Sequence, residues 1–180
     1  MPKICLNDLD ARATKIRSLL NALRPTSRSV STRKVLLREK VLIAAVDKPI
    51  SDNPRDWLFQ TSVKNVWASF CETWLRESRG GYSLSNWALT LYVSEGPLQN
   101  VEAFAVHCEP QYEGTDLTSR CKRLPHVHIK TAKYELGHAH IPLHLFGMED
   151  AHFTIDSLTN FMENTVELAD KEVLRLLGAI

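Results

Sequence analysis

The sequence predicts an α+β fold with N-terminal helices, a four-stranded antiparallel β-meander and a long C-terminal helix packed on the sheet. Apolar residues recur at helical spacing before residue 80, alternate between 85 and 146, and return to helical spacing over 155–177. With 180 residues, 44% of them hydrophobic and 24% charged, the chain is expected to form one domain, 1–180. Its first part, 1–82, is predicted to be mainly helical, and 83–180 to be a ββββα unit.

Three helices are predicted in the N-terminal part. The segment 7–24 carries one apolar stripe with steps of four and three residues, formed by Leu9, Ala13, Ile16, Leu20 and Leu23. The segment 33–47 is apolar nearly all round and predicts a buried helix, although its VLIAAV run also fits a buried strand. The segment 61–78 repeats large apolar residues at helical spacing, and Gly80-Gly81 is a suitable end for it.

Four strands are predicted next, over 85–94, 101–108, 125–132 and 138–146. In the first, Trp87, Leu89 and Leu91 alternate with smaller or polar residues, which is typical of a half-buried strand. Pro142 suits an edge strand or a bulge because proline cannot donate a ladder hydrogen bond. The segment 155–177 predicts the closing helix, about 35 Å long and able to cross a four-stranded sheet.

Charge is balanced overall and uneven locally. The formal net charge of +1 argues against a strongly electrostatic nucleic-acid binder. The segment 24–40 nevertheless has six basic residues and one acidic residue, and 149–172 has seven acidic residues and one lysine. The basic segment is interpreted either as a solvated face or as a contact for phosphates or an acidic protein partner, and the two segments together permit self-association. The candidate contact residues are Arg28, Arg33, Lys34 and Arg38.

The expected location is the cytoplasm. Cys5, Cys71, Cys108 and Cys121 are widely spaced and form no C-x-x-C, which favours free thiols over a disulfide framework. The first fifteen residues lack the apolar run of a signal peptide, and no apolar stretch approaches the ~20 residues of a membrane span. No contact with a membrane is therefore expected.

Histidines are the most informative feature of the sequence. Five of the seven lie between 126 and 144, in two tetrads, His126-Val127-His128-Ile129 and His138-Ala139-His140-Ile141. Side chains at i and i+2 of a strand point to the same face. If 132–138 is the turn of a hairpin, one face gathers the histidines and one lysine: His126, His128, Lys130, His138, His140 and His144. The opposite apolar face is then expected to pack on the C-terminal helix.

Such a face can bind zinc or another divalent metal. Three histidines that leave a fourth position open form a catalytic zinc site, and the candidate ligands are His126, His128, His138 and His140. Glu102, Glu109 or Glu135 can add an oxygen ligand. His107-Cys108 with Cys121 is a further set near His126, although His107 alone is more simply a strand residue near the sheet rim. No H-E-x-x-H motif and no cysteine pair support a known spacing.

The same residues can act without a metal. Two histidines can divide the roles of general base and general acid, and Lys130 can stabilise charge on a phosphate. The preferred hypothesis is a small enzyme that cleaves a phosphoester of RNA, DNA or a nucleotide, with His126, His128, Lys130, His138 and His140 as catalytic residues. The alternative is a non-enzymatic subunit of a larger protein or nucleoprotein complex, with structural histidines or a structural metal.

Overall fold

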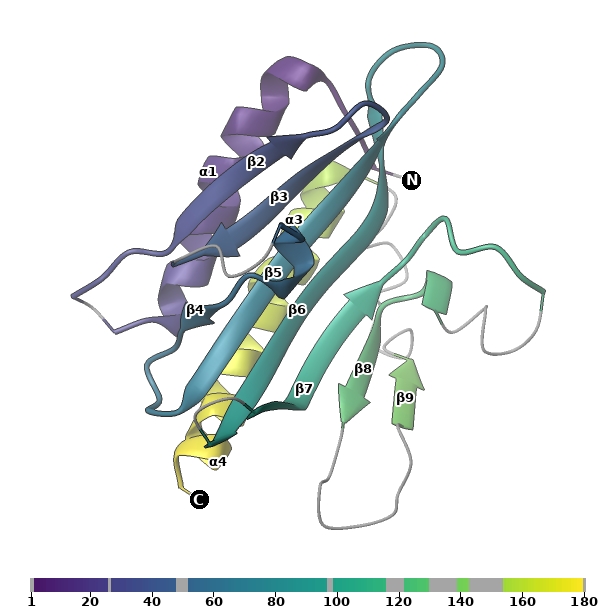
Figure 1. Cartoon of the computed structure of the whole chain (residues 1–180). Coiled ribbons are helices and arrows are strands. Elements are labelled where there is room, and N and C mark those ends of the chain that lie inside the picture. The colour runs from purple at the N-terminus through teal and green to yellow at the C-terminus, as the bar shows by residue number, and fades with distance from the viewer. Residues whose placement is uncertain are drawn as a thin grey trace.

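The protein is built on one open antiparallel sheet with helices on one face (Figure 1). The computed structural model describes residues 2–25, 27–47, 52–96, 99–115, 122–129, 139–142 and 154–179. In this part of the chain the sheet has nine strands in the order β2-β3-β5-β6-β7-β8-β9, with β1 paired to β6 and β4 to β5. The strands are β1 (Lys3–Ile4), β2 (Ser31–Leu36), β3 (Lys40–Val46), β4 (Phe59–Gln60), β5 (Val66–Arg76), β6 (Tyr82–Gly96), β7 (Gln99–Cys108), β8 (His126–Ile129) and β9 (Ala139–Pro142).

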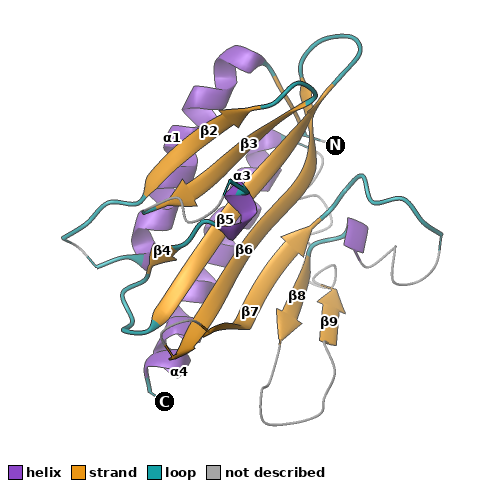
Figure 2. Cartoon of the chain, in the orientation of Figure 1, coloured by secondary structure: helices purple, strands orange, loops and turns teal. Residues whose placement is uncertain are grey.

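Two long helical segments lie behind the sheet, as Figure 2 shows. The first, α1 (Leu9–Leu20), stands between the 3-10 turns Leu6–Asp8 and Asn21–Leu23. The C-terminal helical segment consists of α3 (Ile155–Leu168), a π-helical turn Ala169–Val173 and α4 (Leu174–Gly178). It begins with a capping box, in which the Thr154 side chain accepts a hydrogen bond from the backbone of Ser157 and the Ser157 side chain accepts one from Thr154. Among the described helices, none has both the length and the apolar composition needed to cross a bilayer.

The predicted α+β class, the first helix, the C-terminal helix and four consecutive antiparallel strands are confirmed. The four predicted strands are β6 to β9, and they form the expected meander. The predicted helices over 33–47 and 61–78 are wrong. The first is the hairpin β2–β3 and the second is β5, so the sheet is more than four strands wide and the N-terminal part is not mainly helical.

Burial on both faces explains the error over 33–47. On β3, Val41, Ile43 and Ala45 face the helices, while Leu42 and Ala44 belong to a smaller cluster on the other face. A strand covered on both sides is apolar throughout and has no period of two to reveal it.

The main hydrophobic core lies between the helices and the face of the sheet that they cover. Phe70, Trp74, Trp87 and Leu89 are fully buried there, and Phe70 and Phe161 contact the Trp87 ring edge-on at centroid distances of 5.6 and 5.1 Å. Val127 of β8 belongs to the same cluster as α3 and lines an apolar pocket together with Leu168 and Val173. The apolar face of this strand therefore lies on the side of the C-terminal helix, as predicted.

One ion pair is enclosed in that core. The guanidinium of Arg12 on α1 forms a forked contact with the carboxylate of Glu72 on β5, and the two side chains are 2% and 0% exposed. The indole nitrogen of Trp74 donates to Glu72 Oε2 at 3.1 Å, and Arg12 donates to the Thr159 hydroxyl of α3 at 2.7 Å. Arg12 on α1 therefore connects both α1 and α3 to β5.

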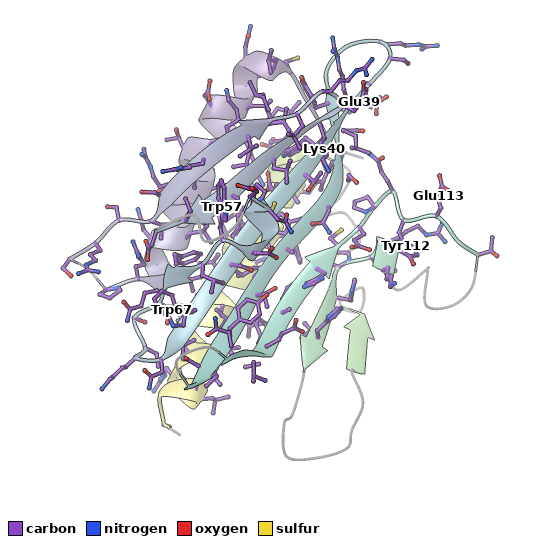
Figure 3. All side chains as sticks on the ribbon, in the orientation of Figure 1. Glu39, Lys40, Trp57, Trp67, Tyr112 and Glu113 are labelled. Carbon is purple, nitrogen blue, oxygen red and sulfur yellow. The ribbon has the colours of Figure 1, made fainter. Side chains whose placement is uncertain are left out.

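The opposite face of the sheet is covered in part by a short segment. Trp57, labelled in Figure 3, packs on Leu42, Ala44, Val46 and Cys71 and is only 6% exposed. It follows the 3-10 turn Pro54–Asp56. The packing of Trp57 fixes the turn over β3 and β5. The neighbouring part of this face, over β6 to β8, is not covered by the turn and carries mainly polar side chains.

Candidate metal centre

The strand register aligns the site in rows across the sheet. One row of directly paired residues runs Cys71, Ala88, His107, His126 from β5 to β8. The adjacent row runs Ser69, Thr90, Ala105, His128 over the same strands. Directly paired residues of antiparallel strands share a face, so all these side chains lie on the same side of the sheet as Trp57.

Three imidazoles meet at the β7–β8 end of these rows. His126 and His128 are 2% and 8% exposed, and His107 is half-buried. The ring of His107 stacks on that of His128 with 4.4 Å between centroids, and the His126 ring lies 4.8 Å from His128 and 6.0 Å from His107. Ala105, between His128 and Thr90 in its row, has a short side chain, which leaves room for His107 to stack diagonally on His128.

The Nδ1 atoms of His126 and His128 each face an acceptor, and that of His126 is within hydrogen-bond distance. Nδ1 of His126 lies 2.8 Å from the carbonyl oxygen of Leu124. Because a carbonyl only accepts, Nδ1 must donate, and in the neutral ring the lone pair then belongs to Nε2. Nδ1 of His128 lies 3.8 Å from Oε1 of Glu102. Metal-binding histidines commonly have such a carbonyl or carboxylate behind the ring, which fixes the tautomer and the ring orientation.

The arrangement fits a transition metal after a small adjustment. One ring nitrogen from each of His107, His126 and His128 lies within 4.8 Å of the others. Zinc bonds of ~2.0–2.1 Å in tetrahedral geometry place ligand nitrogens about 3.3 Å apart. The rings would need to turn inward by about an ångström, which is within reach of rotation about the side-chain bonds. Imidazole ligands suit zinc, copper, iron and nickel better than calcium or magnesium.

Sequence reasoning found two of these three residues. His126 and His128 are predicted ligands, whereas His107 is predicted mainly as a strand residue near the rim and only secondarily as a ligand with Cys108 and Cys121. The missing information was the register of β7 against β8, which pairs His107 directly with His126. Cys108, proposed with His107, is wrong as a ligand because neighbouring strand residues face opposite sides, and its thiol is buried in the core.

The other predicted site residues are placed only in part. The backbone of His140 is paired with that of His128, so the two histidine-bearing strands do form the expected antiparallel pair. Lys130, Glu135, His138 and His144 lie outside the described residues, and so does Cys121. Of the predicted oxygen donors, Glu102 lies behind His128, and Glu109 lines a neighbouring cavity.

That cavity adjoins the histidines and measures about 240 Å³. His107 lines it together with the hydroxyl-bearing residues Ser69, Thr90 and Tyr92. Ala88, which stands between Cys71 and His107 in its row, leaves the space open. Burial raises the pKa of Tyr92, and hydrogen bonds with Ser69 and Thr90 oppose that rise. The phenol therefore keeps its proton and offers a donor beside the histidines.

The predicted basic contact residues do not join this site. Arg33 and Lys34 lie on β2, an edge strand, and Lys34 pairs with Asp10 of α1 at 2.6 Å. Arg38 is exposed in the β2–β3 turn, beside Glu39, which Figure 3 labels at the end of this hairpin. Arg28 borders a separate polar pocket with Lys64 and Ser62. Charges along an edge strand discourage pairing with another sheet, which is one role for this segment without a partner.

No family model matches the chain, and neither a curated protein nor a solved structure matches it. The evidence on function therefore comes from the histidines and their surroundings.

Proposed function

We propose that this protein is a metal-dependent hydrolase whose zinc ion is held by His107, His126 and His128. The observation that supports it is the meeting of three imidazole nitrogens within 4.8 Å on a polar face, beside a cavity. Zinc bound by three histidines with an open fourth position lowers the pKa of a bound water to about 7 and so supplies hydroxide at neutral pH.

The surrounding residues have distinct roles in this proposal. Leu124 orients His126 through a hydrogen bond with Nδ1, and Glu102, 3.8 Å from Nδ1 of His128, would do the same for His128 once the two atoms close to hydrogen-bond distance. The cavity bounded by His107 would receive the group that is hydrolysed. Tyr92, which lines the same cavity and stays protonated, would donate a hydrogen bond to a substrate oxygen.

Metal content and activity test this proposal together. The purified chain is expected to bind one zinc per molecule, and His107→Gln, His126→Gln and His128→Gln should each lower zinc affinity by at least ~10-fold. His152→Gln is the control for the loss of a histidine outside the group. Circular dichroism of each variant separates loss of zinc from loss of fold. Full zinc affinity in all three folded variants would refute the site.

The phosphoester substrate predicted from the sequence is one arm of the activity test. Lys130, the residue expected to hold phosphate, lies outside the described residues. Zinc-loaded protein would be assayed on a phosphodiester, bis(p-nitrophenyl) phosphate, and on a carboxylic ester, p-nitrophenyl acetate. Hydrolysis of either that is lost in His126→Gln supports a hydrolase, and hydrolysis of neither argues for the alternative below.

A structural metal in a non-enzymatic subunit is the second candidate, and the low exposure of His126 and His128 favours it. A structural zinc site is closed by four protein ligands. His140, whose backbone pairs with that of His128, is the residue to vary. X-ray absorption should count three histidine nitrogens and a light oxygen ligand in a catalytic site. Four nitrogens, falling to three in His140→Ala, would indicate a structural site instead.

A further inference from the structure

We propose that the cavity beside the histidines binds a small polar molecule carrying one protonated amine, and that it disfavours phosphate. This inference rests on the proposed function only in treating the cavity as the substrate site of the zinc centre. The cavity's size is the first indication. At about 240 Å³ it is smaller than the ~300–1,000 Å³ that holds drug-sized ligands, so it suits a molecule of about one ring.

Charge is the second indication. Asp56 and Glu109 both line the cavity, and Arg and Lys are absent from its described lining. Glu102 adds a third carboxylate close by, because it is the register partner of the cavity residue Tyr92. Its charge and that of Asp56 both raise the pKa of Tyr92, after the larger effect of burial. Three carboxylates in this part of the polar face favour a cationic ligand over phosphate.

The two lining carboxylates are held in place by the fold. Asp56 belongs to the turn that the buried Trp57 anchors on β3 and β5. Glu109 follows β7, where its backbone nitrogen donates to the carbonyl of Lys122 at 2.9 Å and its Oε1 accepts from the Asn86 amide at 3.2 Å. Positioned acceptors of this kind bind an ammonium group through charge-assisted hydrogen bonds without first losing side-chain freedom.

The rest of the lining suits hydroxyl or amide groups. Ser69, Thr90 and Tyr92 carry hydroxyls that both donate and accept. The side-chain amide of Asn86, which already donates to Glu109, adds a further polar contact. The cavity therefore combines a place for one cation with several neutral polar contacts.

Three probes with one ring and different charges test the inference. D-Glucosamine, D-glucose and D-glucose 6-phosphate would be titrated by calorimetry into the full chain, with and without zinc. Glucosamine is expected to bind at least ~10-fold more tightly than glucose, since one charge-assisted hydrogen bond is worth that much. Glucose 6-phosphate should be the weakest of the three. Equal or tighter binding of glucose 6-phosphate would overturn the proposal.

Variants assign the effect to the cavity. Asp56→Asn and Glu109→Gln should each weaken glucosamine ~10-fold and leave glucose unchanged. Glu113→Gln is the matched control, because this exposed glutamate lies four residues from Glu109, on the segment that leaves the sheet (Figure 3). Unchanged glucosamine binding in both cavity variants would also refute the proposal.

The two proposals fail separately. Glucosamine that binds to a chain without zinc affinity would sustain this inference and remove the proposed function. Zinc that binds to a chain without glucosamine affinity would do the reverse.

Discussion

The Arg12–Glu72 pair yields the strongest stability prediction. Glu72→Gln keeps the size of the side chain and removes its charge, so Arg12 is left as a buried cation without a counter-ion. Breaking a buried pair by changing one partner costs about 3–5 kcal/mol. For a chain of 180 residues the unfolding entropy is about 0.4 kcal/mol/K, so the melting temperature should fall by about 8–13 °C.

A double-mutant cycle measures the pair itself. Arg12→Met and Glu72→Leu should each cost about 3–5 kcal/mol. The double variant should cost only about 1–3 kcal/mol, because no charge remains and the main loss is the acceptor of the Trp74 indole. Urea unfolding, followed by tryptophan fluorescence, provides the three free energies. Additive costs, or a single-variant cost below about 1 kcal/mol, would refute the reasoning.

Three further predictions concern other parts of the chain. Thr154→Ala should destabilise the protein by about 1 kcal/mol in urea unfolding because it removes the N-cap of α3, and Thr154→Ser should restore most of the loss. Burial raises the pKa of Cys108 to about 12 from 9.0, so its contribution to stability is complete below pH 9 and is lost as the pH rises toward 12. Between pH 8 and pH 10.5 the free energy of unfolding of the wild type should fall by about 2 kcal/mol through this thiol, and Cys108→Ala should lack that part of the fall. An equal pH dependence in the two proteins would contradict this. Zinc at 100 times its dissociation constant should raise the melting temperature by about 7 °C, and the rise should disappear in His126→Gln.

The sequence was sufficient where one face of an element is apolar. β6 alternates cleanly, and the stripes of α1 and α3 step by three and four, so these elements were predicted correctly. β5 was misread for a specific reason. Its core face runs Val66, Ala68, Phe70, Glu72, Trp74, where the charge at 72 interrupts the alternation typical of a strand. Trp67 and Cys71 on the other face then complete an apolar spacing that resembles a helix. The buried ion pair is therefore one of the reasons why the sequence does not indicate β5 as a strand.

The site was predictable to the extent that it is local. His126 and His128 share a face through their i, i+2 spacing alone. His107 joins them through a pairing between residues nineteen positions apart, and the intervening segment does not reveal that register. Asp56 reaches the cavity from the turn before Trp57. Its position depends on the packing of Trp57 against the face of the sheet that points away from the helices, which is a tertiary contact.

The rows of paired residues also have a consequence for folding. Because side chains alternate between faces, a slip of β8 by one residue against β7 would bury both histidines against α3 and expose Val127 on the polar face. A metal ion can be held only in the native alignment. Metal binding would therefore stabilise the native register of β8 against β7 relative to every shifted register. The ion would in this way help to select the correct pairing of these two strands.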